Sequence, residues 1–427
     1  MVGDIKTLLK NRKFIYLWTS QIISQLTIQV MNFLLLVNIF KQTGSAIATS
    51  LLWVVYALPA IIIGPLAYVM VDMLDKRKLL VITNLFQAIV ILIYAYFAKD
   101  SFFVLYIVVF IYSFLNQFYV PAESSTLPSI IKTEDLAYAN GLFSLTQQAA
   151  IIFGFGFAGV LNRHLGFVPA IYLCGFLMLI GFISVLYLPK IRPKEAIPTK
   201  PVRAFIKIFS IAVAGYSFIK DHKEVLFPSL LMVGLQVVLT VIIVNMPQIA
   251  HSVVKIDINL TGVYMVVPAG LGAFAASVYV PRLLGRGWRK KRLIDNCLLI
   301  FSLFLISLIF VVPKLVLIYR LLITIITFVF AGIAVVGIIV PSQTYIQNVT
   351  PEKLRGRVFG NFWFLGMVGT LLPILISGIV TQVFGIKFLL FLLSVILFAT
   401  YFWSKKNGER LIQKDFVKVM ENKNIHL

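Results

Sequence analysis

Twelve apolar runs occupy most of the chain, and short polar segments separate them. A helix that crosses a bilayer needs about 20 mostly apolar residues. The pattern therefore predicts an all-α polytopic membrane protein with twelve transmembrane helices in two six-helix halves. The runs are Phe14–Phe40, Ala46–Val71, Leu79–Ala98, Phe102–Val120, Leu136–Leu161, Leu165–Leu188, Leu226–Ile249, Gly262–Leu284, Leu293–Val312, Leu315–Val340, Val358–Phe384 and Phe388–Trp403.

Lys and Arg residues are distributed unevenly between the two sides of these runs. If both termini face the cytoplasm, all but seven of the 38 Lys and Arg residues fall in inner segments or tails. Positive residues gather on the cytoplasmic side of membrane proteins, so the bias predicts cytoplasmic termini. The seven exceptions are Lys41, Lys99, Arg163, Lys255, Lys314, Arg320 and Lys387.

The composition limits the classes of function. It is 60% hydrophobic and 13% charged, which argues against a soluble enzyme. Basic loops beside anionic lipid headgroups account for the net charge of +22 without a nucleic-acid partner. Cys174 and Cys297 both lie in apolar runs, so we expect no disulfide framework and no metal site. We also expect no cofactor.

The longest polar interruption, Lys190–Glu224, divides the runs six and six. It predicts an N-terminal half over residues 1–189, a cytoplasmic linker over 190–224, a C-terminal half over 225–404 and a cytoplasmic tail over 405–427. Basic and apolar residues interleave in Arg203–Tyr216, which is typical of a helix lying in the inner interface. A flexible loop is the alternative for this linker.

Polar residues recur in the first, fourth, seventh and tenth runs. Gln21, Gln25 and Gln29 are spaced by four residues and so share one helix face. Polar groups are costly in hydrocarbon, and these four runs are equivalent in a chain of three-span units. We therefore predict one central substrate cavity, with interhelical hydrogen bonding as the alternative. Its residues are Gln21, Gln25, Gln29, Asn32, Tyr112, Asn116, Gln117, Gln236, Thr240, Arg320, Thr324 and Thr327.

Acidic residues are expected only in loops, tails and at span ends, where Glu123 ends the fourth span on the inner side. A cavity without carboxylates suits a neutral or amphiphilic molecule. Arg320 either binds an anionic group of the substrate or extends to the outer interface.

The inner ends of the spans predict a cytoplasmic gate. We expect Asp72 to pair with a basic residue of its own loop or with the helix start near Arg357, where the helix dipole is positive. We expect Glu123 to interact with Lys76 or Arg77 as well, so that it shares a basic partner with Asp72.

Three motifs resemble one known family. The segment from Gly64 to Lys78 combines a glycine, the acid Asp72 and the basic residues Lys76 and Arg77; Arg355 to Gly360 and the glycines Gly154 and Gly159 form the other two motifs. Together they resemble the major facilitator superfamily, in particular the bacterial drug-exporter branch of macrolide and tetracycline efflux proteins.

This resemblance implies a secondary active exporter of an amphiphilic, drug-like molecule that works by alternating access and proton antiport. It implies a bacterial cytoplasmic membrane, contact with membrane lipids and a monomer. Because no carboxylate is expected at mid-membrane, we expect proton coupling to run through groups at the mouths of the cavity. Coupling should depend on Glu123 or Asp72 at the inner mouth, and His251 and Asp257 are the candidate groups near the outer mouth. Two alternatives remain: translocation of a lipid or lysolipid, and a non-transporting membrane receptor or assembly partner.

Overall fold

The computed structural model describes residues 5–97, 102–132, 135–191, 223–350 and 352–423. Every regular element in these ranges is a helix. Helix α2 (Arg12–Thr43) illustrates how local sequence sets the ends. The Asn11 side chain accepts hydrogen bonds from the backbone N–H groups of Lys13 and Phe14, at 3.1 and 3.4 Å. Gly44 ends the helix with φ of 61°, a conformation that costs glycine little.

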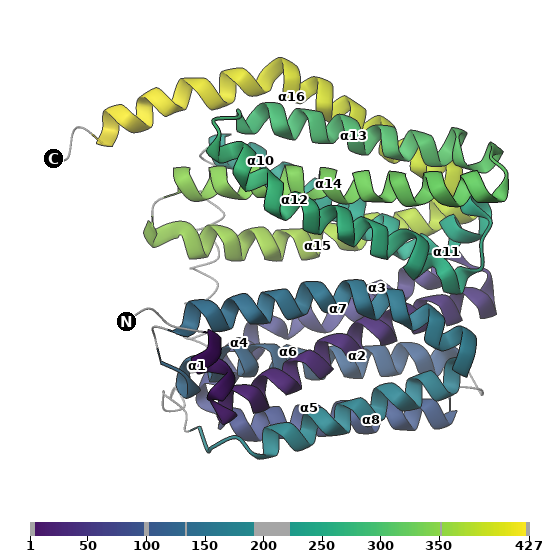
Figure 1. Ribbon diagram of the computed structural model, residues 1–427, viewed down its shortest axis with the longest axis vertical. Coiled ribbons are helices and arrows are strands. Elements are labelled where there is room, and N and C mark those ends of the chain that lie inside the picture. Colours follow the sequence, from purple (N-terminus) through teal and green to yellow (C-terminus); the bar gives the residue numbers. More distant parts are fainter. Residues whose placement is uncertain (1–4, 98–101, 133–134, 192–222, 351, 424–427) are drawn as a thin grey trace. The chain divides into compact units, whose positions relative to one another are not determined.

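The chain divides into two compact units. Unit 1 comprises residues 1–206 and 258–263, and unit 2 comprises residues 207–257 and 264–427. The expected interfacial helix of the linker lies outside the described residues. In unit 1, α5 packs along α8, and α2 packs against α7 and α8 (Figure 1). Besides α2, its helices are α1 (Ile5–Lys10), α3 (Ala46–Ile62), α4 (Gly64–Met73), α5 (Lys76–Phe97), α6 (Phe102–Ile130), α7 (Leu136–Leu165) and α8 (Phe167–Leu186).

In unit 2, α14 packs against both α12 and α13, and α13 also packs against α16 (Figure 1). A π-helix over Ala250–Val254 follows α11. The α-helices are α10 (Lys223–Val244), α11 (Met246–Ile249), α12 (Val267–Gly285), α13 (Lys290–Phe310), α14 (Leu317–Val349), α15 (Glu352–Phe384) and α16 (Ile386–Lys423).

The prediction of an all-α, twelve-span membrane fold is confirmed. Eleven described helices are long and apolar enough to span a membrane, and Ala46–Ile62 is a shorter apolar helix. Several predicted boundaries are wrong; α14 and α16, for example, continue beyond Val340 and Trp403. The second run breaks at Ile63, where Pro65 helps to start α4. The fourth run continues beyond Val120 to Ile130, because a membrane helix can include proline when its surroundings satisfy the freed backbone groups.

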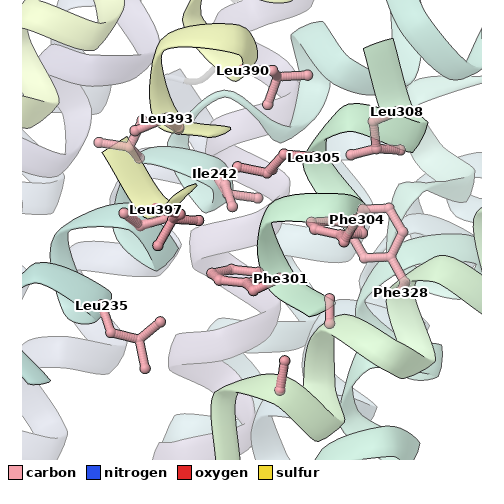
Figure 2. Packing of buried hydrophobic residues seen from close by; sticks show 14 of the residues in the cluster. Leu235, Ile242, Phe301, Phe304, Leu305, Leu308, Phe328, Leu390, Leu393 and Leu397 are labelled. Atoms are coloured by element: carbon pink, nitrogen blue, oxygen red, sulfur yellow. The ribbon is translucent and has the colours of Figure 1, made fainter. Parts of the chain in front are cut away.

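Apolar side chains fill the interior of each unit. Figure 2 shows part of the unit 2 core, where Phe301 and Phe304 of α13 lie near Phe328 of α14 and Leu393 and Leu397 of α16. The rings of Phe304 and Phe328 meet edge to face with centroids 5.0 Å apart. Unit 1 has a corresponding cluster around Phe14, Leu17 and Tyr119. The second cluster surrounds the polar groups described next.

Candidate functional site

Glu123 is a buried acidic residue inside α6, only 3% exposed. The expectation that acids lie only at span ends or outside them is therefore wrong for this residue. It precedes the end of α6 by about two turns, because the helix continues through Pro128. An ionisable side chain within a membrane-spanning helix points to a functional site.

Hydrogen bonds link Glu123 to three other buried side chains. The Tyr119 hydroxyl donates to Glu123 Oε1 at 2.9 Å, so the contact of 3.2 Å between Ser20 and Tyr119 must use the Ser20 proton. Asn84 Nδ2 in turn donates to Ser20 Oγ at 2.9 Å. The chain thus runs from α5 through α2 to α6, with each donor directed toward the carboxyl group.

The predicted pairing of Glu123 with Lys76 or Arg77 is wrong. Lys76 Nζ donates to the Ser125 carbonyl at 3.3 Å, and Arg77 Nη2 donates to the Leu186 carbonyl at 2.5 Å. No ion pair between described side chains includes Glu123. Because α6 continues beyond Val120, Glu123 lies one helical turn after Tyr119, and its side chain is buried against the Tyr119 hydroxyl. The side chains of Asp72 and Arg357, also assigned to the gate, lie outside the described ones.

The lack of an ion pair at Glu123 among the described side chains gives it a specific chemical character. A buried carboxylate without a positive partner is costly, whereas the protonated group is neutral and can itself donate a hydrogen bond. Tyr119 can serve both forms, because a phenol donates and accepts. The arrangement can therefore take up and release a proton without breaking the surrounding network.

Two residues predicted to line the central cavity lie in the interior of unit 1 instead. Gln21 is completely buried and donates to the Phe143 carbonyl of α7 at 3.0 Å. Tyr112 is completely buried near Ser24. Helical geometry explains the error for Gln21, because a spacing of four residues rotates each position by about 40° relative to the last. Gln21 and Gln29 thus point in clearly different directions.

The other cavity residues of unit 1 are partly accessible. Gln117 Nε2 donates to the Ser113 carbonyl of its own helix at 3.0 Å. A half-buried amide can reach a bound molecule, in contrast to the enclosed Gln21. The half-buried set comprises Gln25, Gln29, Asn32, Asn116 and Gln117.

In unit 2, the predicted threonines bond to their own helices. The Thr324 hydroxyl donates to the Arg320 carbonyl at 2.7 Å, and Thr324 is completely buried. Thr240 and Thr327 are half-buried, with bonds of 2.8 Å to the carbonyls of Gln236 and Ile323. Gln236 is exposed and Arg320 is half-buried. One cavity shared by both sets of residues stays a prediction.

The buried polar residues of α5 were missed because only the first, fourth, seventh and tenth runs were read, whereas Ser20 and Ser24 were overlooked within the first run itself. Thr83, Asn84 and Gln87 on α5 are at most 3% exposed, as are Ser20 and Ser24 on α2. Their signal was present in the sequence, because three polar residues fall within five positions of the third apolar run.

Unit 1 also contains an apolar pocket of about 350 Å³ between α2, α7 and α8. Its wall includes Leu26, Phe153, Leu173 and Cys174, and exposes only carbon and sulfur atoms. A pocket without an accessible donor or acceptor cannot orient the polar part of a ligand. We therefore place the candidate site at Glu123 rather than here.

Comparison with known proteins connects this geometry to a family. The sequence model of the Major Facilitator Superfamily matches residues 17–373. The chain is 27% identical over 205 residues to the MFS-type transporter YjbB of Bacillus subtilis, covering 47% of this chain and 51% of that protein. It is 26% identical over 184 residues to macrolide efflux protein A of Streptococcus pyogenes, covering 42% and 45%. The chain thus spans about half the length of these two relatives.

Solved structures agree on the fold. The crystal structure of the nucleoside transporter NupG superimposes with a TM-score of 0.71 at 14% identity, covering 93% of this chain and 99% of that one. A bacterial homologue of the human lysosomal transporter Spinster gives a TM-score of 0.69 at 15% identity, covering 87% and 83%. At these identities the likeness establishes the fold alone.

Proposed function

Because the chain belongs to the Major Facilitator Superfamily, we propose that it is a secondary active transporter that exports an amphiphilic, drug-like molecule in exchange for protons. The similarity to macrolide efflux protein A supports the direction and the substrate class. The bias of Lys and Arg supports a cytoplasmic-membrane location with both termini inside.

The observation that carries the coupling part of the proposal is the burial of Glu123 against Tyr119. Antiport by alternating access needs a group that binds a proton in one state and releases it in the other. A carboxyl group with a hydroxyl partner meets this requirement. In this scheme Glu123 takes up a proton from outside as the substrate leaves, and it releases the proton to the cytoplasm when the next substrate molecule binds.

Half-buried amides are the proposed polar contacts of the substrate. Gln25, Gln29 and Asn116 contribute from unit 1, and the exposed Gln236 contributes from unit 2, each able to donate and accept hydrogen bonds. These neutral groups suit an amphiphile better than a small cation. Asp72 remains the proposed gate residue, and we expect Asp72→Asn to reduce transport without reducing expression.

Arg320 gives a reason to retain lipid or lysolipid translocation as a second candidate. Its Nε atom is buried and has no hydrogen-bond partner among the described residues. A guanidinium group binds phosphate well. If Arg320→Gln abolishes movement of a fluorescent lysolipid but leaves macrolide export intact, the result supports a lipid site at this residue.

Proteoliposomes under an imposed pH gradient test the main proposal. Macrolide addition should cause proton flux in the parent protein, and Glu123→Gln should abolish that flux while retaining macrolide binding. Asp295→Asn is the matched control, since Asp295 is a buried carboxyl group already paired with Lys291. Full flux in Glu123→Gln would reject Glu123 as carrier. Absence of flux in the parent would reject proton antiport, and absence of substrate movement would favour the receptor alternative.

A further inference from the structure

A column of polar side chains runs through the interior of unit 1. None of its members is more than 3% exposed, and they come from three helices that the hydrogen bonds already link. Most members of each helix recur at spacings of three, four or seven residues, which places them on one face, whereas the adjacent Thr83 and Asn84 lie about 100° apart around α5. The column comprises Ser20, Ser24 and Thr27 on α2, Thr83, Asn84 and Gln87 on α5, and Tyr112, Tyr119 and Glu123 on α6.

Several atoms of this column have no hydrogen-bond partner among the described residues. They include both polar atoms of the Gln87 amide, the hydroxyl of Tyr112 and Oδ1 of Asn84. Gln87 alone offers two donor hydrogens and a carbonyl oxygen to its surroundings. Buried polar groups are nearly always satisfied, and a buried water with two to four polar partners is the usual solution. The column therefore has the chemistry of a site for ordered water.

Hydroxyl groups lie between the Tyr112 end of the column and Glu123, although the Tyr112 hydroxyl has no direct hydrogen-bond partner among the described residues. Ser24 lies within interaction range of the hydroxyls of both Tyr112 and Tyr119, and Tyr119 donates to Glu123. Tyr112 and Glu123 are about 16 Å apart along the axis of α6. This separation is too long for direct proton transfer, so Ser24, Tyr119 and water are needed between them.

We propose that this column is a hydrated proton pathway that serves Glu123 through the interior of unit 1. The proposal rests on the proposed function, which supplies the need to move protons. Each water or hydroxyl group accepts a proton on one side and releases its own on the other. A single proton thus reaches the Glu123 carboxylate. Only O–H bonds form and break, and no electrons are transferred.

Asn84 and Gln87 have a different role from the hydroxyl groups. An amide N–H donates but does not relay a proton at neutral pH, so these two residues are positioning residues. Asn84 fixes the orientation of Ser20, and Gln87 holds water in place. On α2, the predicted cavity residues Gln25 and Gln29 lie off the face that Ser20, Ser24 and Thr27 share, whereas Asn116 lies on the same face of α6 as Tyr112 and Glu123.

The exchange of the Glu123 proton with deuterium tests the pathway directly. Infrared difference spectra of the full protein in proteoliposomes follow the carboxyl band after a change to D₂O, and loss of the band in Glu123→Gln assigns it. We expect Tyr112→Phe and Ser24→Ala to slow this exchange at least tenfold. Tyr94→Phe, which removes another buried phenol of unit 1, should leave the rate unchanged.

Gln87→Met separates a hydrated column from a dry one. It keeps the side-chain length but removes the amide, so a hydrated pathway predicts slower exchange with no gain in melting temperature. An unchanged exchange rate in Tyr112→Phe, Ser24→Ala and Gln87→Met, together with a higher melting temperature in Gln87→Met, would overturn the proposal. The exchange needs no substrate. Failure of antiport in the flux assay is therefore distinguishable from failure of the pathway.

Discussion

Glu123 and Asp295 are both buried carboxyl groups, but their surroundings differ at the level of single atoms. Asp295 accepts from Lys291 Nζ at 2.8 Å and from Ser404 Oγ at 2.5 Å, near the start of α13. Glu123 accepts from the neutral Tyr119. The charge of Asp295 is matched by an ion pair, whereas the described partner of Glu123 is a neutral hydroxyl that can both donate and accept a hydrogen bond. We therefore assign a structural role to Asp295 and propose a coupling role for Glu123.

Removing the Tyr119 hydroxyl should affect both stability and coupling. Tyr119→Phe leaves a buried Glu123 oxygen without its donor, which costs about 1–3 kcal/mol. We expect a lower melting temperature and about tenfold slower substrate-driven proton flux in proteoliposomes. Tyr94→Phe serves as the control for loss of a buried hydroxyl. Normal flux in Tyr119→Phe would mean that Glu123 exchanges its proton without this partner.

At the scale of elements, α10 and α15 are joined by a polar contact at a break in the helix path. Asn245 lies between α10 and α11 and is 1% exposed. Its amide nitrogen donates to Ser377 Oγ at 3.1 Å, and its oxygen accepts from Thr381 Oγ1 at 3.0 Å. An amide can satisfy both hydroxyls at once, which keeps this interruption of the span stable within the membrane.

The Asn245 contact can be measured with a double-mutant cycle. We expect Asn245→Leu to lower the free energy of unfolding by about 1–3 kcal/mol, because it leaves two buried hydroxyls without this partner. Thr381→Val should cost less when added to Asn245→Leu than when made alone, because the bond is already lost. Strict additivity in thermal unfolding would show that the two side chains do not interact.

Close approach of α12 and α14 depends on glycine. A Cβ atom at Gly332 would overlap the carbonyl oxygen of Ala269, and one at Gly272 would overlap that of Val329. We expect Gly332→Ala to destabilise unit 2 by about 1–3 kcal/mol through overpacking. Gly234→Ala is the matched control, since nothing lies within 4 Å of its Cβ position in α10. This control should be neutral or stabilising by up to about 1 kcal/mol. Equal melting temperatures for both variants would contradict the packing argument.

At the scale of the whole molecule, the chain passes from one unit to the other more than once. Residues 258–263 belong to unit 1, although their neighbours in sequence belong to unit 2. Asn259 Oδ1 accepts from Lys41 Nζ at 3.2 Å and from Asn162 Nδ2 at 2.9 Å. Gly159 allows this segment to approach, because a side chain there would overlap the Asn259 carbonyl oxygen. A short segment is thus held by contacts distant in sequence.

The orientation of the whole molecule can be tested at the two ends of one helix. Arg289 precedes α13, and Lys314 follows it; both are exposed. We expect a membrane-impermeant maleimide to label Lys314→Cys in intact cells and Arg289→Cys only after permeabilisation. The parent protein is the control, because Cys174 and Cys297 are both buried. Labelling of Arg289→Cys in intact cells would reverse the topology.

The sequence by itself determined the class of fold and the spans, because the cost of placing polar backbone in lipid makes helices of apolar runs almost obligatory. It also identified Glu123 and Tyr112 as residues of interest, without their surroundings. Only the tertiary structure decided that Gln21 and Tyr112 point into the bundle and that Glu123 meets Tyr119 rather than Lys76. Hydropathy reports how well a segment suits lipid but not which way each helix turns. The partners that decide chemistry, such as Ser20 and Tyr119, lie 99 positions apart and meet only when the helices pack.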